Sequence, residues 1–508
     1  MIRIGKDLQV GLYGLFGLYF IFVFLRSGNN EYEPILSTLP STTETDVLII
    51  GAGIAGLTAA ATLKEQGIKF KILEASSSIG GRLQTTRQFG GVGFDMGPTL
   101  VYEPAWPNII AKKDVNATTM RFSSRKLPCY GLWVFENYTW NDFVMDHMQP
   151  NPSEIVHSCF VESVSYPKKK GKKASKQDKE TTDTTKEDEE SRVTAVCGKH
   201  TFHAKHVIVT SPLNVIKGGD MVFDPPLPKA LVQNHPATIM DGIKVVMEFK
   251  WPFYPKYMDM GWYQPKDPPG LTKFYGADLL QPHSRNYVIV GDILGSHATQ
   301  YYDMTESSAV QHVLDLKKPN WRKDWSETNF TNHILKILDK QMNNYFLQDD
   351  VVSANLIKMQ VIYWNNVKSI RGGSIQPFSC APPVEESSGD DDDVDGEESD
   401  DEDDKPKICG GTELINGKLI LAGEAFPYIS NPDEIGWVHN AALSGRHAAG
   451  QVLTKLILPD KKGTQIAAKL KLPTKTDWQS PWLNPKLAGE VTKEEIAEAA
   501  VKRAELIK

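Results

Sequence analysis

Three glycines and one acid near the start of the chain have the spacing of a phosphate-binding turn. Gly51, Gly53 and Gly56 form a G-x-G-x-x-G run, and Glu74 follows 23 residues after the first of them. In such a run the first glycine permits a sharp turn, the second lets the backbone approach a pyrophosphate, and the third lets a helix pack closely on a strand. A carboxylate at Glu74 can accept hydrogen bonds from ribose hydroxyls. The spacing therefore predicts dinucleotide binding; the alternative is a glycine-rich turn without a ligand.

The residues around this run have the pattern of a βαβ unit, which is the element that must position such glycines. Residues 47–50 have the apolar pattern of a buried strand, residues 57–66 that of a helix ending at Gly67, and residues 70–73 that of a second strand. This order is typical of the start of a nucleotide-binding domain. The sequence therefore predicts an α/β fold that contains a Rossmann-like domain with a parallel sheet.

The residues after Glu74 resemble a known family. The run from Glu74 to Arg82, E-A-S-S-S-I-G-G-R, is similar to the E-A-x(n)-G-G-R extension of the flavin-containing amine oxidases, which include monoamine, polyamine and L-amino-acid oxidases. The resemblance implies that the cofactor is FAD and that Arg82 contacts its diphosphate as a charge-assisted pair. A second segment resembles the family's D-L-G-A-x-W run, whose backbone follows the flavin, and supplies Gly97, Pro98, Thr99 and Leu100. Pro98 and Leu100 replace the usual Ala and Trp.

The resemblance resumes in the second half of the chain, in the family's order. Val161 matches the valine whose backbone meets the adenine. Glu424, in L-A-G-E-A, matches the glutamate that binds the ribityl–phosphate region. Val438, in G-W-V-H-N-A-A-L-S-G, matches a residue that offers its N–H to the flavin pyrimidine from a helix N-terminus, which favours an anionic ring. We therefore expect distant segments to close around one FAD.

Three positions are expected to face the reacting end of the flavin. Lys244 matches the family lysine that reaches flavin N5 through a water; the alternative is a strand lysine that points to solvent. Trp437 stands where the family usually has a tyrosine, one wall of an aromatic cage that attracts amines; the alternative is core packing. Ile375 occupies the second wall, so the cage is half aliphatic. Ser374 stands where monoamine oxidases carry the flavin-linked cysteine, so FAD is predicted to bind non-covalently.

The resemblance implies a reaction and leaves two others open. The main hypothesis is an FAD-dependent oxidoreductase acting on a CH–NH group, which moves a hydride from an amine carbon to flavin N5 and is reoxidised by O₂ to give H₂O₂; polyamines are one candidate substrate. One alternative is a flavin desaturase or protoporphyrinogen-type oxidase with a lipophilic substrate. The other is a flavin-binding scaffold with impaired catalysis, because residues 102–160 are few for a substrate domain of this family.

An apolar segment near the start of the chain predicts contact with a lipid bilayer. Residues 8–25 carry no charge, and eighteen helical residues at about 1.5 Å each span roughly 27 Å, close to the core of a thin bilayer. Arg3 and Lys6 precede them, which favours a cytosolic N-terminus and a lumenal or extracellular body. The alternative is a cleaved signal peptide. Sequons at Asn116, Asn137 and Asn329 fit a lumenal body.

Composition excludes several other classes. Residues 385–404 hold 14 of the 63 acids, and the remainder of the chain has 49 acids against 56 basic residues, so the net charge of −7 describes one local tract. Five cysteines without a Cys-x-x-Cys pair exclude a disulfide scaffold and a zinc ribbon, and no metal site is predicted. Residues 168–190 hold eight lysines and seven acids, so this loop gives no basis for nucleic-acid binding.

These observations predict a discontinuous domain organisation. Two inserts, 167–191 and 385–405, have too few apolar residues to offset the entropy cost of ordering and are expected to be disordered. The FAD-binding domain is assembled from 46–101, 155–240 and 364–457, and an α+β substrate domain from a shortened segment 102–154 and from 241–363. A tail (1–7), a single transmembrane anchor (8–25) and a linker (26–45) precede them, and a tail with a helix (458–508) follows.

Overall fold

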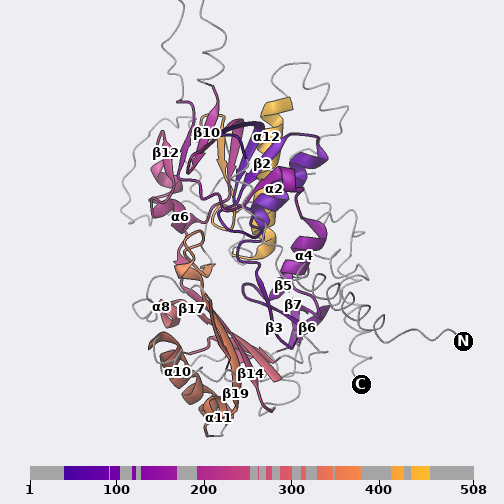
Figure 1. Cartoon of the computed structure of the whole chain (residues 1–508), viewed down its shortest axis with the longest axis vertical. Coiled ribbons are helices and arrows are strands. Elements are labelled where there is room, and N and C mark those ends of the chain that lie inside the picture. Colours follow the sequence, from indigo (N-terminus) through magenta and orange to yellow (C-terminus); the bar gives the residue numbers. More distant parts are fainter. Residues whose placement is uncertain are drawn as a thin grey trace, which may run out of the picture.

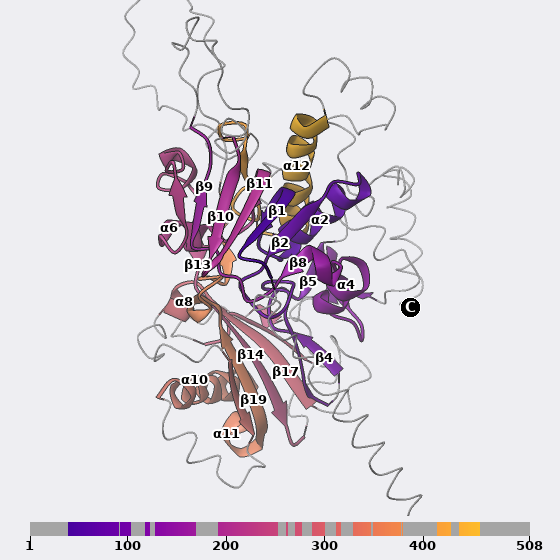
Figure 2. The same cartoon turned by 45° about the horizontal axis from the view of Figure 1, so that its top comes forward.

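A computed structural model describes residues 39–90, 92–102, 117–121, 128–168, 191–251, 261–262, 270–276, 287–299, 311–315, 329–346, 349–376, 378, 414–427 and 436–457. These residues form two lobes, each built on its own sheet (Figures 1 and 2). A largely parallel sheet with helices α2 and α12 makes one lobe, and an antiparallel sheet with helix α10 makes the other.

The first sheet is centred on β1 (Thr42–Ile50), which pairs in parallel with β2 (Phe70–Leu73) on one side and β11 (His200–Val209) on the other. Its strand order is β12-β9-β10-β11-β1-β2-β8, and β21 also pairs with β11. The other strands are β8 (Ile155–Val156), β9 (Ser163–Ser165), β10 (Val193–Cys197), β12 (Val222–Asp224) and β21 (Leu419–Leu421). The C-terminal half of β1 is buried, as a central parallel strand must be. The predicted βαβ start is confirmed.

Helix α2 (Ile54–Glu65) begins three residues earlier than predicted. Gly53 is its N-cap, and the N–H of Leu57 donates to the carbonyl oxygen of Gly53 at 2.9 Å. The helix therefore starts inside the glycine run, because that run turns the chain directly from strand to helix.

Helix α12 (Val438–Ile457) lies beside α2 in both views, although the two are far apart in the sequence (Figures 1 and 2). Their buried apolar residues belong to one core cluster with Val47 and Ile49 of β1. The first and last parts of the described chain therefore share one hydrophobic core.

The second sheet has the order β15-β16-β17-β14-β19-β18 and is antiparallel throughout. Its strands are β14 (Gly242–Phe249), β15 (Gly261–Trp262), β16 (Lys273–Gly276), β17 (Tyr287–Leu294), β18 (Gln311–Asp315) and β19 (Leu356–Tyr363). One face packs against α10 (Asn329–Phe346) through Leu338 and Met342. The other face meets Phe89 and Phe94 of the hairpin β3 (Thr85–Phe89) and β4 (Val92–Asp95).

The short segment between the flavin-like motifs forms a small unit of its own. Strands β5 (Leu100–Tyr102), β7 (Pro128–Phe135) and β6 (Ala117–Arg121) make a three-stranded sheet, and α4 (Trp140–His147) follows. A capping box between Thr139 and Asp142 starts α4, and Asp95 Oδ1 accepts a hydrogen bond from the N–H of Trp140 at 3.0 Å. The small elements that remain are α6 (Leu213–Lys217), β13 (Ile239–Met240), α8 (Ser296–Thr299), α11 (Val351–Asn355), β20 (Ser374–Ile375) and the 3₁₀ turns Pro152–Glu154, Lys229–Leu231 and Trp364–Asn366.

Several sequence predictions fall outside the described residues. The apolar segment 8–25, most of the insert 167–191, the acidic insert 385–405 and the C-terminal helix are among them. Of the helices that are described, none is both long and apolar enough to cross a membrane. The first insert is flanked by β9 and β10, which pair antiparallel and so form a hairpin. A disulfide that the sequence did not predict joins Cys159 to Cys197 across this hairpin.

Candidate active site

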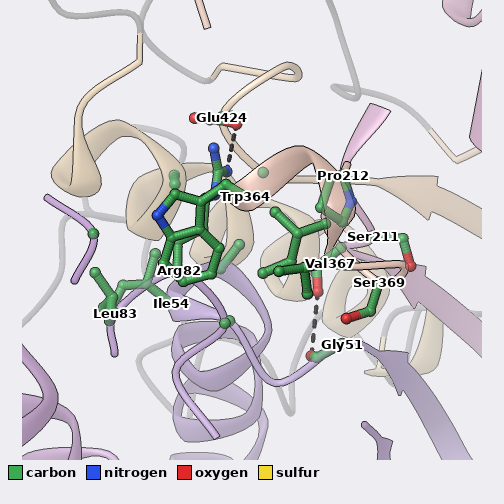
Figure 3. A pocket seen from close by; sticks show the side chains of 18 of the residues that line it. Gly51, Ile54, Arg82, Leu83, Ser211, Pro212, Trp364, Val367, Ser369 and Glu424 are labelled. Atoms are coloured by element: carbon green, nitrogen blue, oxygen red, sulfur yellow. Dashed lines mark hydrogen bonds and ion pairs between the residues drawn. The ribbon is translucent and has the colours of Figure 1, made fainter. Parts of the chain in front are cut away.

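A cavity of about 660 Å³ lies where the two lobes meet. It falls within the size range of pockets that bind cofactors and small molecules. Its wall contains every predicted cofactor or catalytic residue except Gly56. Those lining residues are Gly51, Gly53, Glu74, Arg82, Gly97, Pro98, Thr99, Leu100, Val161, Lys244, Ile375, Glu424, Trp437 and Val438. The structure thus brings together residues from nearly the whole length of the described chain, some of which Figure 3 shows.

The glycine turn at one end of the cavity is shaped as its sequence predicts. Gly51 has φ +102°, a conformation that other residues rarely adopt. A Cβ on Gly56 would lie 2.0 Å from the carbonyl oxygen of Gly51, so this glycine lies behind the turn and permits its close packing. A Cβ on Gly53 would meet no described atom within 4 Å. The space beside Gly53 is therefore open to a ligand.

Glu74 is buried at the end of β2, next to the glycine turn. Its Oε2 accepts a hydrogen bond from the N–H of Ala52 at 2.6 Å, and its Oε1 accepts from the N–H and the hydroxyl of Ser76 at 2.8 and 2.7 Å. A carboxylate has about four acceptor sites, so capacity remains for one further donor such as a sugar hydroxyl. Val161, which is also buried, lines the same part of the cavity.

Arg82 and Glu424 form an ion pair on the cavity wall, drawn as a dashed line in Figure 3. A second guanidinium nitrogen of Arg82 donates to the carbonyl oxygen of Gly373 at 3.0 Å. The resemblance implied that both charged residues contact the cofactor, and in the structure they also contact each other. Because a guanidinium has five N–H donors, these two contacts are compatible with a further bond to a phosphate.

Lys244 lies on the central strand β14 of the second sheet, and its side chain is 2% exposed. Its Nζ lies 2.6 Å from Asp292 Oδ1 and donates to Thr99 Oγ1 at 3.1 Å. The alternative of a lysine that points to solvent is therefore wrong. Sequence reasoning missed Asp292, although one acid inside the apolar run of β17 is the signal that could have identified it.

The two expected cage positions lie close together. Ile375 is buried on β20, and a Cβ on Gly436 would lie 2.9 Å from its Cγ2. Trp437 follows Gly436 directly, and α12 begins at Val438, so the N-terminus of α12 adjoins the cavity. Trp364 also lines the cavity, and its Nε1–H donates to the carbonyl oxygen of Met96 at 2.9 Å.

One buried acid near Lys244 has an unusual protonation equilibrium. Burial raises the pKa of Asp95 to about 8, and the hydrogen bond from the N–H of Trp140 and the charge of Lys244 oppose that rise only in part. Asp95 therefore keeps its proton to a higher pH than an exposed aspartate does. Within the described part of the chain, no group of three or more His, Cys, Asp or Glu side chains is placed to hold a metal ion.

Comparisons with known proteins agree with this geometry. A family model described as flavin containing amine oxidoreductase matches residues 168–319, and one described as NAD(P)-binding Rossmann-like domain matches residues 49–111. Among solved structures, cyclohexylamine oxidase from Brevibacterium oxydans has a TM-score of 0.51 at 14% identity, covering 81% of this chain and 99% of that one. This likeness shows a shared fold.

Two curated relatives match over short stretches. An L-amino-acid oxidase of Siganus canaliculatus is 44% identical over 64 residues, which is 12% of each chain. A 4,4'-diapophytoene desaturase of Staphylococcus aureus is 43% identical over 58 residues, which is 11% of each chain. The matches therefore span about a tenth of these relatives and carry no information about most of their length.

Proposed function

This chain belongs to the family of flavin-containing amine oxidases, which are flavin-dependent oxidoreductases, and on that premise we propose that it binds FAD non-covalently and oxidises an amine. The proposed reaction moves a hydride from the carbon beside the amine nitrogen to the flavin, and O₂ then takes up the electrons to form H₂O₂. The observation that carries this proposal is one cavity with a phosphate-binding turn in its wall and a buried lysine, Lys244, elsewhere in the same wall.

The residues present fit a flavin dinucleotide. The open space beside Gly53 and the remaining acceptor capacity of Glu74 suit a pyrophosphate and a ribose. The N-terminus of α12 suits the electron-rich side of a flavin ring. Ser374 offers a hydroxyl where a covalent link would need a thiol, which supports non-covalent binding.

Bound FAD would supply the acceptor for the hydride, and the chain supplies position and charge. Trp437, Ile375 and Trp364 line the cavity and offer apolar surface against which a substrate carbon could lie. An amine must be unprotonated to give up a hydride, and a water-poor site favours its neutral form. Lys244 places a proton donor on the same wall, where it can bind a water or stabilise developing negative charge.

A second candidate reaction, desaturation of a lipophilic substrate, is favoured by two observations. Ile375 gives the cage an aliphatic wall, and one curated relative bears the name of a desaturase. A polyene substrate would need only apolar walls. Trp437 would therefore attract the amine in the first reaction and would only pack against the substrate in the second.

Anaerobic bleaching of the bound flavin distinguishes these readings. Purified protein would be mixed with cyclohexylamine, putrescine, spermine, L-leucine or a carotenoid precursor, and absorbance near the flavin maximum followed; reactive compounds would then be tested for H₂O₂ in air. Bleaching and peroxide with amines alone support the proposal. Bleaching by the polyene alone supports desaturation, and bound flavin that no compound bleaches supports a scaffold without turnover.

We also propose that residues 8–25 anchor the body to a membrane on its lumenal or extracellular side. Asn137, the first residue of a sequon, is exposed just before α4, where a glycan could be accommodated. Carbonate extraction of membranes tests the anchor, because a spanning segment stays in the pellet. A glycosidase-sensitive mass shift that is reduced in Asn137→Gln tests the side. Release by carbonate would contradict the anchor.

A further inference from the structure

We propose that Asp292 is a positioning residue, which holds the ammonium group of Lys244 on the cavity wall beside the flavin. The inference rests on the proposed flavin site and adds to it a residue whose carboxylate fixes where this ammonium lies and keeps it protonated. Nothing in the glycine or cage motifs required an acid at this position.

The sheet places the two side chains directly opposite each other. Lys244 of β14 is the register partner of Asp292 in β17, and Ile362 of β19 is its partner on the other side. One step along the same pleat, Gly242 is opposite Leu294. All five residues line the cavity, so this face of the sheet forms its floor. Cross-strand neighbours on one face lie close enough for a direct ion pair.

The ion pair is held from several directions. The carbonyl oxygen of Asp292 accepts hydrogen bonds from the N–H of Thr272 at 2.6 Å and from its hydroxyl at 2.9 Å, which anchors β17 beside β16. Thr99 contacts Lys244 from the segment that is expected to run along the flavin. The Nζ is therefore located by the carboxylate of Asp292 in β17 and by the hydroxyl of Thr99, just before β5.

Burial decides which protonation state this arrangement favours. The side chains of Lys244 and Asp292 are 2% and 10% exposed, and an unpaired ammonium at such a site would tend to lose its proton. A carboxylate 2.6 Å away favours the charged form, and the pair as a whole adds little net charge to the cavity. Asp292 thus retains the proton on Lys244 while moderating the field that a flavin ring would experience.

A second acid also acts on this pair. Asp95 of β4 interacts electrostatically with Lys244, and its own pKa of about 8 means that it titrates in the experimental range. A test must therefore separate the titration of Lys244 from that of Asp95.

The absorption spectrum of bound, oxidised flavin provides such a test, because it responds to a nearby charge without any turnover. Difference spectra of the flavin-loaded protein would be recorded from pH 6 to 11 for the wild type, Asp292→Asn, Asp292→Glu and Lys244→Met. We expect one step that is absent in Lys244→Met. In Asp292→Asn its midpoint should fall by about 1–3 pH units, and Asp292→Glu should restore most of that loss. Asp95→Asn identifies the step that belongs to Asp95.

Two controls keep the outcome clear. Asp220→Asn removes the carboxylate of another ion pair, with Arg371, outside the cavity wall and should leave the Lys244 step unchanged. If Asp292→Asn does not fold, the double variant Lys244→Met with Asp292→Asn should fold, because a neutral pair leaves no buried charge; failure of the double variant to fold would overturn the pairing.

The possible failures can be told apart. Purified protein without flavin would refute the proposed function and this inference together. If flavin is retained and the Lys244-dependent spectral step has the same midpoint pH in Asp292→Asn as in the wild type, only the role of Asp292 is overturned. Retained flavin with no Lys244-dependent step would show that the ammonium does not face the ring.

Discussion

Gly445 of α12 lies against the backbone of Ala55 in α2, so closely that a Cβ on Gly445 would be 1.9 Å from the carbonyl oxygen of Ala55. This contact fixes the separation of the two helices. Because α12 starts at Val438, it also fixes where that residue and Trp437 meet the cavity. The glycine turn and the late helix are therefore set against each other by direct backbone contact.

The first prediction follows from this contact. Gly445→Ala should destabilise the protein by about 1–3 kcal/mol, the usual cost of overpacking, and should weaken flavin retention because α12 must move outward. Thermal unfolding and the ratio of flavin to protein absorbance measure the two effects. Thr454→Ala, an exposed change on the same helix, should alter stability by no more than about 0.5 kcal/mol. Unchanged stability of Gly445→Ala would show that the helices can separate freely.

Gly53→Val should separate folding from cofactor binding. A Cβ at Gly53 meets no described atom, so the protein should fold normally, while the added side chain fills the space expected for the pyrophosphate. We expect flavin affinity to fall by about tenfold or more, equivalent to about 1.4 kcal/mol. Fluorescence titration of flavin-stripped protein measures this affinity. Gly56→Val is the contrasting variant: it should impair folding, because its Cβ would clash with Gly51. An unchanged flavin affinity in Gly53→Val would refute the phosphate-turn assignment.

Lys244→Met should slow flavin reoxidation and leave FAD bound. The structure adds a cost in stability, because the variant removes the ammonium that pairs with the buried carboxylate of Asp292; breaking a buried pair costs about 3–5 kcal/mol. Stopped-flow mixing of reduced protein with O₂ measures the rate, and the double variant with Asp292→Asn should recover stability without recovering the rate. A normal reoxidation rate in Lys244→Met would contradict a role for Lys244 in the reaction with O₂ and would leave it only a structural role.

Asp95 should make the protein less stable as pH rises. In the unfolded chain its carboxyl ionises near its ordinary pKa of 3.8, whereas burial holds the folded pKa at about 8. Between these values the folded state binds more protons than the unfolded state, so each pH unit lowers the free energy of unfolding by up to about 1.4 kcal/mol. Asp95→Asn keeps an oxygen acceptor for the N–H of Trp140 and should remove this slope. Parallel slopes in chemical denaturation from pH 5 to 8 would contradict the assignment.

Acid precipitation should release all of the flavin into the supernatant. Ser374 lines the cavity where the resemblance places a flavin-linked cysteine in monoamine oxidases, and a hydroxyl does not form that thioether. Flavin absorbance is measured in the pellet and in the supernatant, and we expect all of it in the supernatant. A flavin-linked peptide in the pellet would contradict non-covalent binding.

Local features of the site were predictable from the sequence, and long-range ones were not. The strands at 47–50 and 70–73 and the turn between them follow from residue pattern alone, and the structure confirms them. Lys244 was recognisable because it matches the family lysine. Asp292 interrupts the apolar run of β17, but its role could not be read from that run, because it depends on which residue of β14 stands opposite it.

The same limit explains the other omissions. The need for a glycine at position 445 arises only from the close contact of α2 and α12, which are separated by most of the chain. The three-stranded sheet β5-β7-β6 was missed because the segment 102–154 shows no clear period, and its strands are defined by pairing with one another. Asp95 acquires its role only when α4 begins beside it.

The covalent link between Cys159 and Cys197 closes the base of the lysine-rich insert, since the two sulfurs stand on either side of it. A protease that nicks the insert would therefore produce two fragments that still migrate as one band on a gel until a reductant is added. The same disulfide tethers the chain next to Val161. The insert could therefore change in length without moving Val161 from the cavity wall.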